Sequence, residues 1–322
     1  MNQLDNIKLP IQSELATFHQ LYDEAMKSDN ALLNQVLLHL RKSVGKQMRP
    51  ILTLLIARLF GEINRKTYDA AISLELLHTA SLVHDDVVDE SDKRRGALSV
   101  NAAFNNKVAV LSGDYLLSTS LLYVAKTDIH SVEIVSSLGQ QLSRGELLQL
   151  FNTTATDFRE DTYYTVIREK TASLFEACCM LGAISTHASD EQKEQCRKFG
   201  ECIGMIFQIR DDIFDYFSKD VGKPTGNDMR EGKLTLPALY VINHATNEEV
   251  KQKALRIRSL SASESEIQEF IQYVIHNGGI DYAREVMAEL HQTALRCIPV
   301  EAPADIRQAL DTYLNFVSDR EQ

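Results

Sequence analysis

The chain has 322 residues, 44% of them hydrophobic and 25% charged, so it can bury a sizeable core and is neither disordered nor fibrous. Its net charge of −11 disfavours binding to nucleic acids or anionic membranes, which an acidic surface repels. The five cysteines show no CxxC spacing, no signal-peptide pattern opens the sequence, and no apolar run reaches about 18 residues. We therefore expect a soluble cytoplasmic protein without disulfides or structural zinc.

The apolar residues recur with helical spacing along most of the chain. Proline, which interrupts helices, is absent between Pro50 and Pro224. No stretch alternates apolar and polar residues as a half-buried strand would. In chain order, the expected helical stretches include 32–40, 72–83, 106–125, 133–150, 199–213, 267–274, 286–290 and 306–313. The pattern predicts one all-α domain over residues 1–322, a bundle of ten or more helices, and it is weakest in residues 1–30.

Two aspartate-rich motifs lie within these apolar helical stretches. Both have the form DDxxD: the first aspartate motif is Asp85-Asp86-Val87-Val88-Asp89, and the second is Asp211-Asp212-Ile213-Phe214-Asp215. Residues three and four apart share a helix face, so Asp211 points with Asp215 and with Gln208 one turn earlier. Like charges at this spacing repel, and a divalent cation such as Mg²⁺ would offset that cost. A single motif could be a solvated helix face, whereas two copies in apolar helices favour metal binding.

Basic residues accompany both motifs. They are Lys46 and Arg49 upstream, Lys93, Arg94 and Arg95 after the first motif, and Lys223 and Lys233 after the second. Arginine binds phosphate oxygens through a two-pronged fork and lysine binds them as a point charge. Each basic cluster alone would be ordinary surface, but together they indicate two anion sites, one metal-dependent and one metal-free. His78 falls on the same helix face as Asp85 and could bind a phosphate, although a lone helical histidine is more often structural.

Several further motifs follow one another in a fixed order. They are GKQMRP at 45–50, ELLHTASLVHDD at 75–86, RRG at 94–96, GDY at 113–115, GE at 145–146 followed by Gln149, KTA at 170–172, FQ directly before Ile209, and the segment 222–237. In this ordered series the chain resembles the trans-type (all-E) polyprenyl diphosphate synthases, and more closely their long-chain, octaprenyl diphosphate synthase-like members. The resemblance covers roughly residues 40–240.

This resemblance implies an isoprenoid synthase-like helical bundle around a central cavity and a Mg²⁺-dependent enzyme. The reaction would condense isopentenyl diphosphate head-to-tail with an allylic diphosphate such as farnesyl diphosphate. Mg²⁺ on the allylic diphosphate would be held by Asp85, Asp86, Asp89, Asp211, Asp212 and Asp215. The same diphosphate would contact Arg94, Lys170, Thr171, Gln208, Lys223 and Lys233, and isopentenyl diphosphate would bind Lys46, Arg49, His78 and Arg95. The residues expected to act in catalysis are Asp85, Asp86, Asp89, Lys170, Gln208, Asp211 and Lys223.

The implied chemistry needs no protein nucleophile. The bond between the allylic carbon and its diphosphate breaks, and cations stabilise the charge that develops on the leaving group. The alkene of isopentenyl diphosphate then attacks the allylic cation, and a proton leaves to the released diphosphate. A cavity lined by apolar helix faces would keep water from the cation.

Product length is expected to depend on the residues one and two helical turns before Asp85. Ala80 and Ser81 are small there, whereas short-chain relatives often carry a large aromatic residue that blocks the growing tail. With Leu77 one turn deeper, the sequence predicts a hexaprenyl to decaprenyl product, centred on octaprenyl. The alternative is that both small residues merely pack against a neighbouring helix.

Three other functions remain open at this point. A short-chain synthase would make farnesyl or geranylgeranyl diphosphate, a class I terpene cyclase would share the fold without an isopentenyl diphosphate site, and an inactive partner subunit would be expected to lack some aspartates. The resemblance further implies a homodimer, in some relatives with a second subunit. By analogy the product would serve as a quinone side chain, and its release would involve at most transient membrane association.

Overall fold

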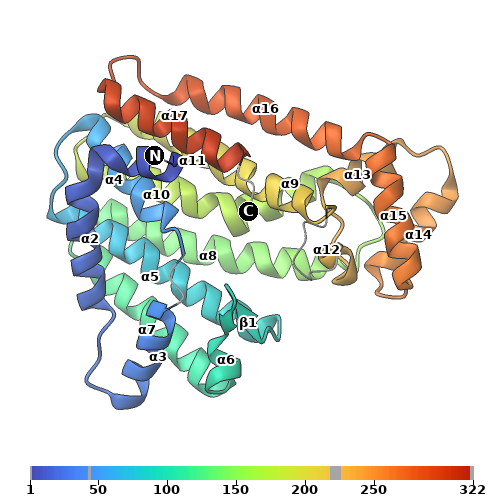
Figure 1. Cartoon of the computed structure of the whole chain (residues 1–322), viewed down its shortest axis with the longest axis horizontal. Helices are drawn as coiled ribbons and strands as arrows, with labels where there is room; N and C mark the ends of the chain where they lie inside the picture. Colours follow the sequence, from blue (N-terminus) through green and yellow to red (C-terminus); the bar gives the residue numbers. More distant parts are fainter. Residues whose placement is uncertain (1, 43–44, 218–225, 320–322) are drawn as a thin grey trace. The chain divides into compact units, whose positions relative to one another are not determined.

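The computed structural model describes residues 2–42, 45–217 and 226–319 (Figure 1). These residues form well over ten helices, and the strands among them are limited to one hairpin, which confirms the all-α prediction. None of the described helices is both long enough and apolar enough to cross a membrane. The chain divides into two compact units, each built from three separate segments. The prediction of one domain over residues 1–322 stays a prediction.

The first unit comprises Met1–Gly139, Leu174–Lys198 and Ile298–Tyr313. Its elements are α1 (Gln3–Lys8), η1 (Leu9–Ile11), α2 (Gln12–Ala25), α3 (Ala31–Lys42), α4 (Met48–Phe60), α5 (Arg65–Val88), α6 (Val100–Ala103), α7 (Asn106–Val124) and most of α10 (Ser173–Ser185). Parts of α8 (Ile129–Asn152), α11 (Asp190–Phe214) and α17 (Ala304–Asp319) also belong to it.

Helix α5 is the long internal helix of this unit and carries the first aspartate motif at its end. It begins at a capping box, in which the Asn64 side chain accepts hydrogen bonds from the backbone N–H groups of Lys66 and Thr67. Its residues are buried on most sides, and some of its buried polar side chains bond to neighbouring helices; the Ser73 hydroxyl, for example, donates to the Ser120 carbonyl on α7 at 2.9 Å. Figure 1 shows α5 and α7 lying side by side.

A short antiparallel hairpin follows α5 and was not expected from the sequence. Strand β1 (Lys93–Arg94) pairs with β2 (Ala97–Leu98). Arg95 and Gly96 connect them with φ angles of 52° and 80°, the positive values that a two-residue hairpin turn requires. Strands of two residues are too short to show an alternation of apolar and polar residues, so they could not be predicted from that pattern.

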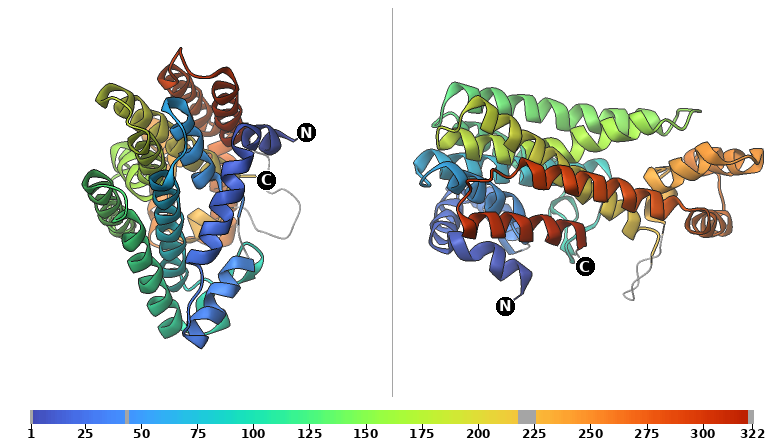
Figure 2. Two further views of the ribbon diagram at one scale, coloured as in Figure 1. Left: turned by 90° about the vertical axis from the view of Figure 1, so that its left-hand side faces the viewer. Right: turned by 90° about the horizontal axis from the view of Figure 1, so that it is seen from above.

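The second unit comprises Gln140–Ser173, Phe199–Cys297 and Leu314–Gln322. Besides the remaining parts of α8, α11 and α17 it contains α9 (Glu160–Ile167), the π-helical segment η2 (Arg168–Ala172), α12 (Asn227–Arg230), α13 (Leu236–His244), α14 (Glu248–Arg258), α15 (Glu264–His276) and α16 (Gly279–Cys297). Buried residues such as Ile209, Leu239 and Phe270 form one continuous apolar core. Figure 2 shows α14 and α15 side by side in this unit.

Candidate active site

The first aspartate motif lies at the C-terminal end of α5, in the first unit. Asp85 and Asp86 belong to the last helical turn, and Asp89 is the residue directly after the helix. Asp86 is buried and accepts a hydrogen bond from Arg94 Nε at 2.7 Å. Burial raises the pKa of Asp86, and the Arg94 guanidinium opposes that rise. Asp85 is half-buried and Asp89 exposed, so the motif reaches from the interior to the surface.

The hairpin β1–β2 places two of the predicted phosphate-binding arginines beside α5. Arg94 is paired with Asp86, so a cation predicted to bind a diphosphate contacts a carboxylate of the motif. The Arg95 guanidinium approaches Gly45 so closely that a Cβ added at Gly45 would lie 2.8 Å from its Cζ. Glycine at 45 therefore makes room for Arg95 next to the exposed Lys46.

Arg49 and His78 meet inside the first unit. Arg49 Nη1 lies 2.9 Å from His78 Nε2, and since guanidinium can only donate, the imidazole accepts with Nε2. Burial, aided by Arg49 and Arg95, lowers the pKa of His78 well below its usual value, so the imidazole is neutral. The Arg49 guanidinium also lies 5.0 Å from the centre of the Phe175 ring. The structure thus places Arg49 and His78 in contact, and their binding role stays a prediction.

A small pocket of about 50 Å³ in the first unit collects several of these residues. Its lining includes His78, Asp86, Arg94 and Arg95 together with Glu75, a buried carboxylate on α5. One oxygen of Glu75 has no hydrogen-bond partner among the described residues. Burial raises the pKa of Glu75, whereas Arg49 and Arg95 act in the opposite direction. A pocket with this concentration of arginine suits an anionic ligand.

The predicted chain-length residues lie on α5 in the same unit. Leu77 and Ala80 are each 2% exposed, and Ser81 is half-buried. The Ser81 hydroxyl donates to the His78 carbonyl at 2.9 Å and so is satisfied within its own helix. All three side chains are therefore uncharged and at least half-buried, and those of Ala80 and Ser81 are also small.

The second aspartate motif lies at the C-terminal end of α11, in the second unit. Asp212 is buried and accepts hydrogen bonds from Tyr163 Oη at 2.6 Å and from Gln208 Nε2 at 2.8 Å. Burial, and after it the charge of Asp228, raises the pKa of Asp212 well above its usual value. Gln208 was predicted to share a helix face with Asp211 and Asp215, and its side chain also reaches Asp212, the residue four positions later on the same helix.

Asp215, the last residue of the motif, follows the end of α11 and holds a neighbouring backbone segment. Its Oδ1 accepts from the N–H of Asn227 at 2.9 Å and its Oδ2 from the N–H of Asp228 at 3.0 Å. These two bonds fix the start of α12. Burial, followed by the charge of Asp215, raises the pKa of Asp228 to about 7.

The segment η2 brings two more predicted residues to the second motif. Thr171 donates from Oγ1 to Gln208 Oε1 at 2.8 Å, and Lys170 forms an ion pair with Glu146 of α8. Glycine at 145 permits this approach, because a Cβ there would lie 2.9 Å from the backbone nitrogen of Lys170. A π-helical turn adds one residue to the helix, and such turns are frequent at functional sites.

A pocket of about 170 Å³ in the second unit is lined by Lys170, Thr171, Gln208, Asp212 and Lys233, among others. Lys233 Nζ lies 2.6 Å from Glu231 Oε2. Lys223, the remaining predicted lysine, lies outside the described residues. The structure therefore brings together five predicted residues of the second unit around one cavity.

Sequence reasoning missed three residues next to the second motif. Asp228 and Tyr163 line the same pocket, and Arg210 forms an ion pair with Asp211 at 2.5 Å. Asp228 lies in the 222–237 segment that had been noticed as a whole, so its acidic character was the available signal. Tyr163 is 49 residues from Asp212 in sequence, and no local pattern points from one to the other.

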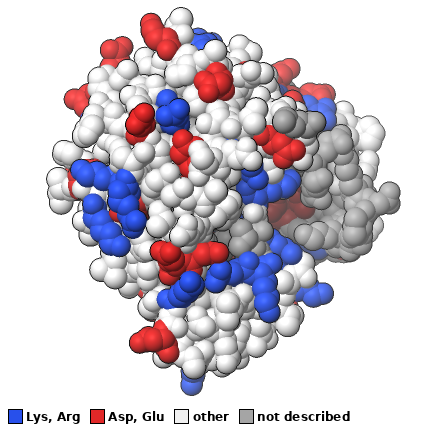
Figure 3. Space-filling view, turned by 60° about the vertical axis from the view of Figure 1, so that its left-hand side comes forward, with Lys and Arg blue, Asp and Glu red and all other residues white. Residues whose placement is uncertain are grey.

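The motif residues fit a hard divalent cation by their chemistry. Carboxylate oxygens are the ligands that Mg²⁺ prefers, and it commonly binds through one or two of them together with water and substrate phosphates. Burial and the neighbouring Asp228 disfavour the ionised form of Asp212, and a bound cation would favour that form. Among the described residues, no group of three or more His, Cys, Asp or Glu side chains is arranged to hold a metal ion unaided. Figure 3 shows Lys and Arg side chains gathered in several groups on one face, beside acidic ones.

Comparison with known proteins agrees with this chemistry. A family model described as polyprenyl synthetase matches residues 30–274. The all-trans-nonaprenyl-diphosphate synthase (geranyl-diphosphate specific) of Rhodobacter capsulatus is 36% identical over 322 residues, covering 98% of each chain. The octaprenyl diphosphate synthase of Escherichia coli (strain K12) is 31% identical over 322 residues, covering 99% of each chain. The crystal structure of a geranylgeranyl pyrophosphate synthase from Bacteroides thetaiotaomicron is 46% identical, with a TM-score of 0.86 over 99% of this chain and 100% of that one. The chain belongs to the polyprenyl synthetase family and is a prenyltransferase.

Proposed function

We propose that the enzyme makes a long all-trans polyprenyl diphosphate of about eight isoprene units by adding isopentenyl diphosphate repeatedly to an allylic diphosphate. The observation that carries the chain-length part is the pair of small residues before the first motif, Ala80 and Ser81. With Ala80 buried and Ser81 half-buried beside Leu77, no bulky side chain stands at either position. The octaprenyl and nonaprenyl products named for two full-length relatives support the same range.

In this proposal the isopentenyl diphosphate binds to the arginine-rich pocket of the first unit. Arg49, His78 and Arg95 meet its phosphates, and Lys46 adds a cation at the surface. The neutral imidazole of His78 has already accepted a hydrogen bond with Nε2, so Nδ1 is the atom left to donate. Glu75 lies among these arginines and keeps them from repelling one another.

The allylic diphosphate is assigned to the aspartate motifs and their cations. Asp85, Asp86 and Asp89 and, in the second motif, Asp211, Asp212 and Asp215 are the proposed Mg²⁺ ligands. Bound Mg²⁺ would neutralise the diphosphate and so make it a better leaving group. Arg94, Lys170, Lys233 and Lys223 add positive charge, and Thr171 and Gln208 orient the reacting end. Since Asp215 already accepts two backbone N–H bonds, its part in the site includes holding α12.

The assembly and location form a further part of the proposal. Helix α7 exposes Leu111 and Leu122, which are 68% and 67% exposed and lie on one face, about three turns apart. An apolar face of this kind suits a homodimer contact. The five cysteines are buried thiols that form no disulfide, as expected in a reducing compartment such as the cytoplasm. The product is proposed to become the side chain of a quinone.

The test incubates the purified protein with Mg²⁺, farnesyl diphosphate and labelled isopentenyl diphosphate, and then sizes the dephosphorylated products by chromatography. A discrete polyprenol of about eight units, lost in Asp85→Ala, is the expected result. No incorporation with geranyl, farnesyl or geranylgeranyl diphosphate would contradict the proposal and favour a partner subunit or a cyclase.

A second candidate product is geranylgeranyl diphosphate. The similar crystal structure from Bacteroides thetaiotaomicron, at 46% identity, is that of a geranylgeranyl pyrophosphate synthase. A product that stops at four isoprene units would establish this candidate and would show that a residue other than Ala80 or Ser81 closes the cavity.

A further inference from the structure

Arg210 connects the second aspartate motif to the C-terminal helix within the second unit. It directly precedes Asp211 on α11 and is 5% exposed. Nη2 donates to Asp211 Oδ1 at 2.5 Å, and Nη1 donates to the backbone carbonyl of Val317 in the last turn of α17. One guanidinium therefore touches both a motif carboxylate and the end of another helix.

The surroundings of this guanidinium fix both its place and its charge. Its Cζ lies 4.9 Å from the centre of the Phe207 ring and 5.6 Å from that of Phe214. Nε is buried and has no hydrogen-bond partner among the described residues, so the contacts of the guanidinium do not satisfy all of its donors. Arginine does not lose its proton in proteins, and the buried positive charge is therefore permanent.

Asp211 is the residue on which this charge acts. Its side chain is 45% exposed, so part of the carboxylate remains open to an incoming ion. A divalent cation that binds there must share the carboxylate with a positive charge that cannot move away, because the Val317 carbonyl and the two rings hold it. Like charges at such distances oppose each other's binding.

We propose that Arg210 is a positioning residue that orients Asp211 before metal binds and weakens the binding of a divalent cation until a diphosphate supplies additional negative charge. This inference rests on the proposed function, in which Asp211 is a metal ligand. Its consequence is that metal and diphosphate enter the second motif together, since the metal alone is disfavoured.

The experiment measures Mn²⁺ binding to the full chain by electron paramagnetic resonance, with and without inorganic pyrophosphate, and needs no turnover. Arg210→Gln keeps an N–H for the Val317 carbonyl and removes the charge, and Arg210→Met removes both. Without pyrophosphate we expect both variants to bind Mn²⁺ about tenfold more tightly than the native chain, the size of effect a neighbouring charge has on a carboxylate. The increase in affinity that pyrophosphate causes should be correspondingly smaller in both.

Two controls separate this effect from a general one. Arg210→Lys retains the charge and should bind Mn²⁺ like the native chain. Arg256→Met removes one positive charge from α14, where Arg256 pairs with Glu266, and should also leave Mn²⁺ affinity unchanged. Thermal unfolding of each variant identifies any that fail to fold, and Arg210→Gln, which keeps a donor for the Val317 carbonyl, still tests the proposal if Arg210→Met fails.

The outcomes distinguish this inference from the proposed function. Equal Mn²⁺ affinity in the native chain and Arg210→Gln, or altered affinity in Arg210→Lys, would overturn the inference. Equal Mn²⁺ binding in the native chain and Asp211→Asn would instead show that Asp211 is no metal ligand. It would then have to be removed from the Mg²⁺ ligands of the proposed function.

Discussion

The contact between Arg49 and His78 shows how one hydrogen bond sets the chemical state of a residue. Arg49 donates, so His78 Nε2 must accept, and burial keeps the ring neutral. Arg49 Nε is also buried and has no hydrogen-bond partner among the described residues. An unsatisfied buried donor costs roughly 1–3 kcal/mol, which a phosphate oxygen would recover on binding.

A bulky side chain at position 80 or 81 is expected to shorten the product. Ala80→Phe and Ser81→Phe place a ring one turn before Asp85, where it would stop the growing tail at four or fewer isoprene units. The measurement is the product length by chromatography of the dephosphorylated chains. The rate of the first isopentenyl addition to geranyl diphosphate serves as the control and should stay within a few-fold of the native value.

Unchanged product length in both variants would show that these residues only pack inside the protein. Loss of the first isopentenyl addition would instead mean that the helix end carrying Asp85 had been displaced. Measuring both product length and the rate of the first addition distinguishes these two results.

The individual site residues differ in how well sequence predicts them. The aspartates, Lys170 and Arg94 could be named because their charge stands out in apolar stretches and in an ordered series of motifs. The helix face of Gln208 was predicted, but helical spacing alone did not show that its hydrogen bond goes to Asp212. Tyr163 was missed because its partner, Asp212, is distant in the sequence and only packing brings the two together.

At the scale of elements, two glycines allow helices to approach each other at the candidate site. Gly145 lets η2 lie against α8 in the second unit, and Gly113 lets α5 lie against α7 in the first. A Cβ at position 113 would fall 2.2 Å from Nε2 of His84, the residue before Asp85. Nothing larger than a hydrogen atom fits there without a shift of the imidazole.

Gly113→Ala is expected to destabilise the protein by about 1–3 kcal/mol, the usual cost of overpacking. The displaced His84 would also lose its contact with Asp114, at 3.4 Å, and disturb the start of the first motif. Thermal or denaturant unfolding measures the change. With His84→Ala the imidazole is absent, so Gly113→Ala should destabilise the His84→Ala variant less than it destabilises the native chain. An equal loss of stability in both would contradict the argument.

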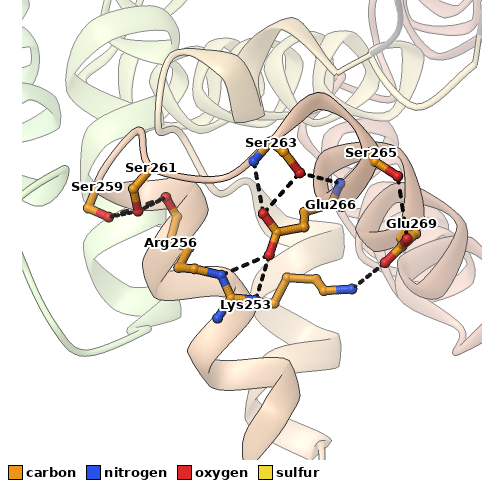
Figure 4. Close-up of polar contacts among 8 residues, drawn as sticks. All are labelled: Lys253, Arg256, Ser259, Ser261, Ser263, Ser265, Glu266 and Glu269. Atoms are coloured by element: carbon orange, nitrogen blue, oxygen red, sulfur yellow. Dashed lines mark hydrogen bonds and ion pairs between the residues drawn. The ribbon is translucent and has the colours of Figure 1, made fainter.

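The helix pair α14–α15 is held by charged contacts at its connecting turn, as Figure 4 shows. The Ser263 N–H donates to Glu266 Oε2 at 2.9 Å and the Glu266 N–H donates to Ser263 Oγ, which together form a capping box. Arg256 Nε donates to Glu266 Oε1 at 2.9 Å, so α14 is tied to the cap of α15. Lys253 and Glu269 add an ion pair at 2.8 Å.

Acid should weaken this helix pair in a defined pH window. The Ser263 backbone N–H, with Arg256, lowers the pKa of Glu266 to about 2 from its usual value of 4.5. The stabilisation is therefore complete above about pH 4.5 and is lost as the pH falls towards 2. In unfolding experiments between pH 6 and pH 2, the difference in stability between the native chain and Glu266→Gln should shrink with falling pH. Glu249→Gln, an exposed carboxylate on α14, provides the matched control, and a constant difference for Glu266→Gln would refute the assignment.

The elements were predictable to the extent that they repeat a pattern. Long amphipathic and buried helices were found from apolar spacing, including both that carry aspartate motifs. The hairpin β1–β2, the π-helical η2 and the short α12 were not, because each is set by a few local bonds, such as those from Asp215 to α12. These short elements nevertheless present Arg94, Lys170 and Asp228.

At the scale of the whole molecule, an acidic chain with a net charge of −11 is proposed to bind its anionic substrates through local concentrations of arginine and lysine. The composition disfavoured nucleic-acid binding in general but could not locate these concentrations. The assembly proposed above depends likewise on an exposed surface, the apolar face of α7.

Acidic substitutions on that face should separate the proposed homodimer. Leu111→Glu and Leu122→Glu each place a charge among apolar side chains, so the double variant is expected to sediment as a monomer in analytical ultracentrifugation. Leu260→Glu, at a position 66% exposed on the loop after α14, is the control and should leave the mass unchanged. A double variant that sediments like the native protein would exclude this face as the contact.

The five cysteines, all buried thiols outside any disulfide, give the protein a property that its catalysis does not require. All are buried, and burial raises the pKa of the Cys178 thiol to about 12, so the folded protein should resist alkylation. Cys178 and Cys179 lie in the first unit and Cys202 in the second. Alkylation followed by peptide mass spectrometry would therefore time the opening of each unit separately, with reporters that the natural sequence already supplies.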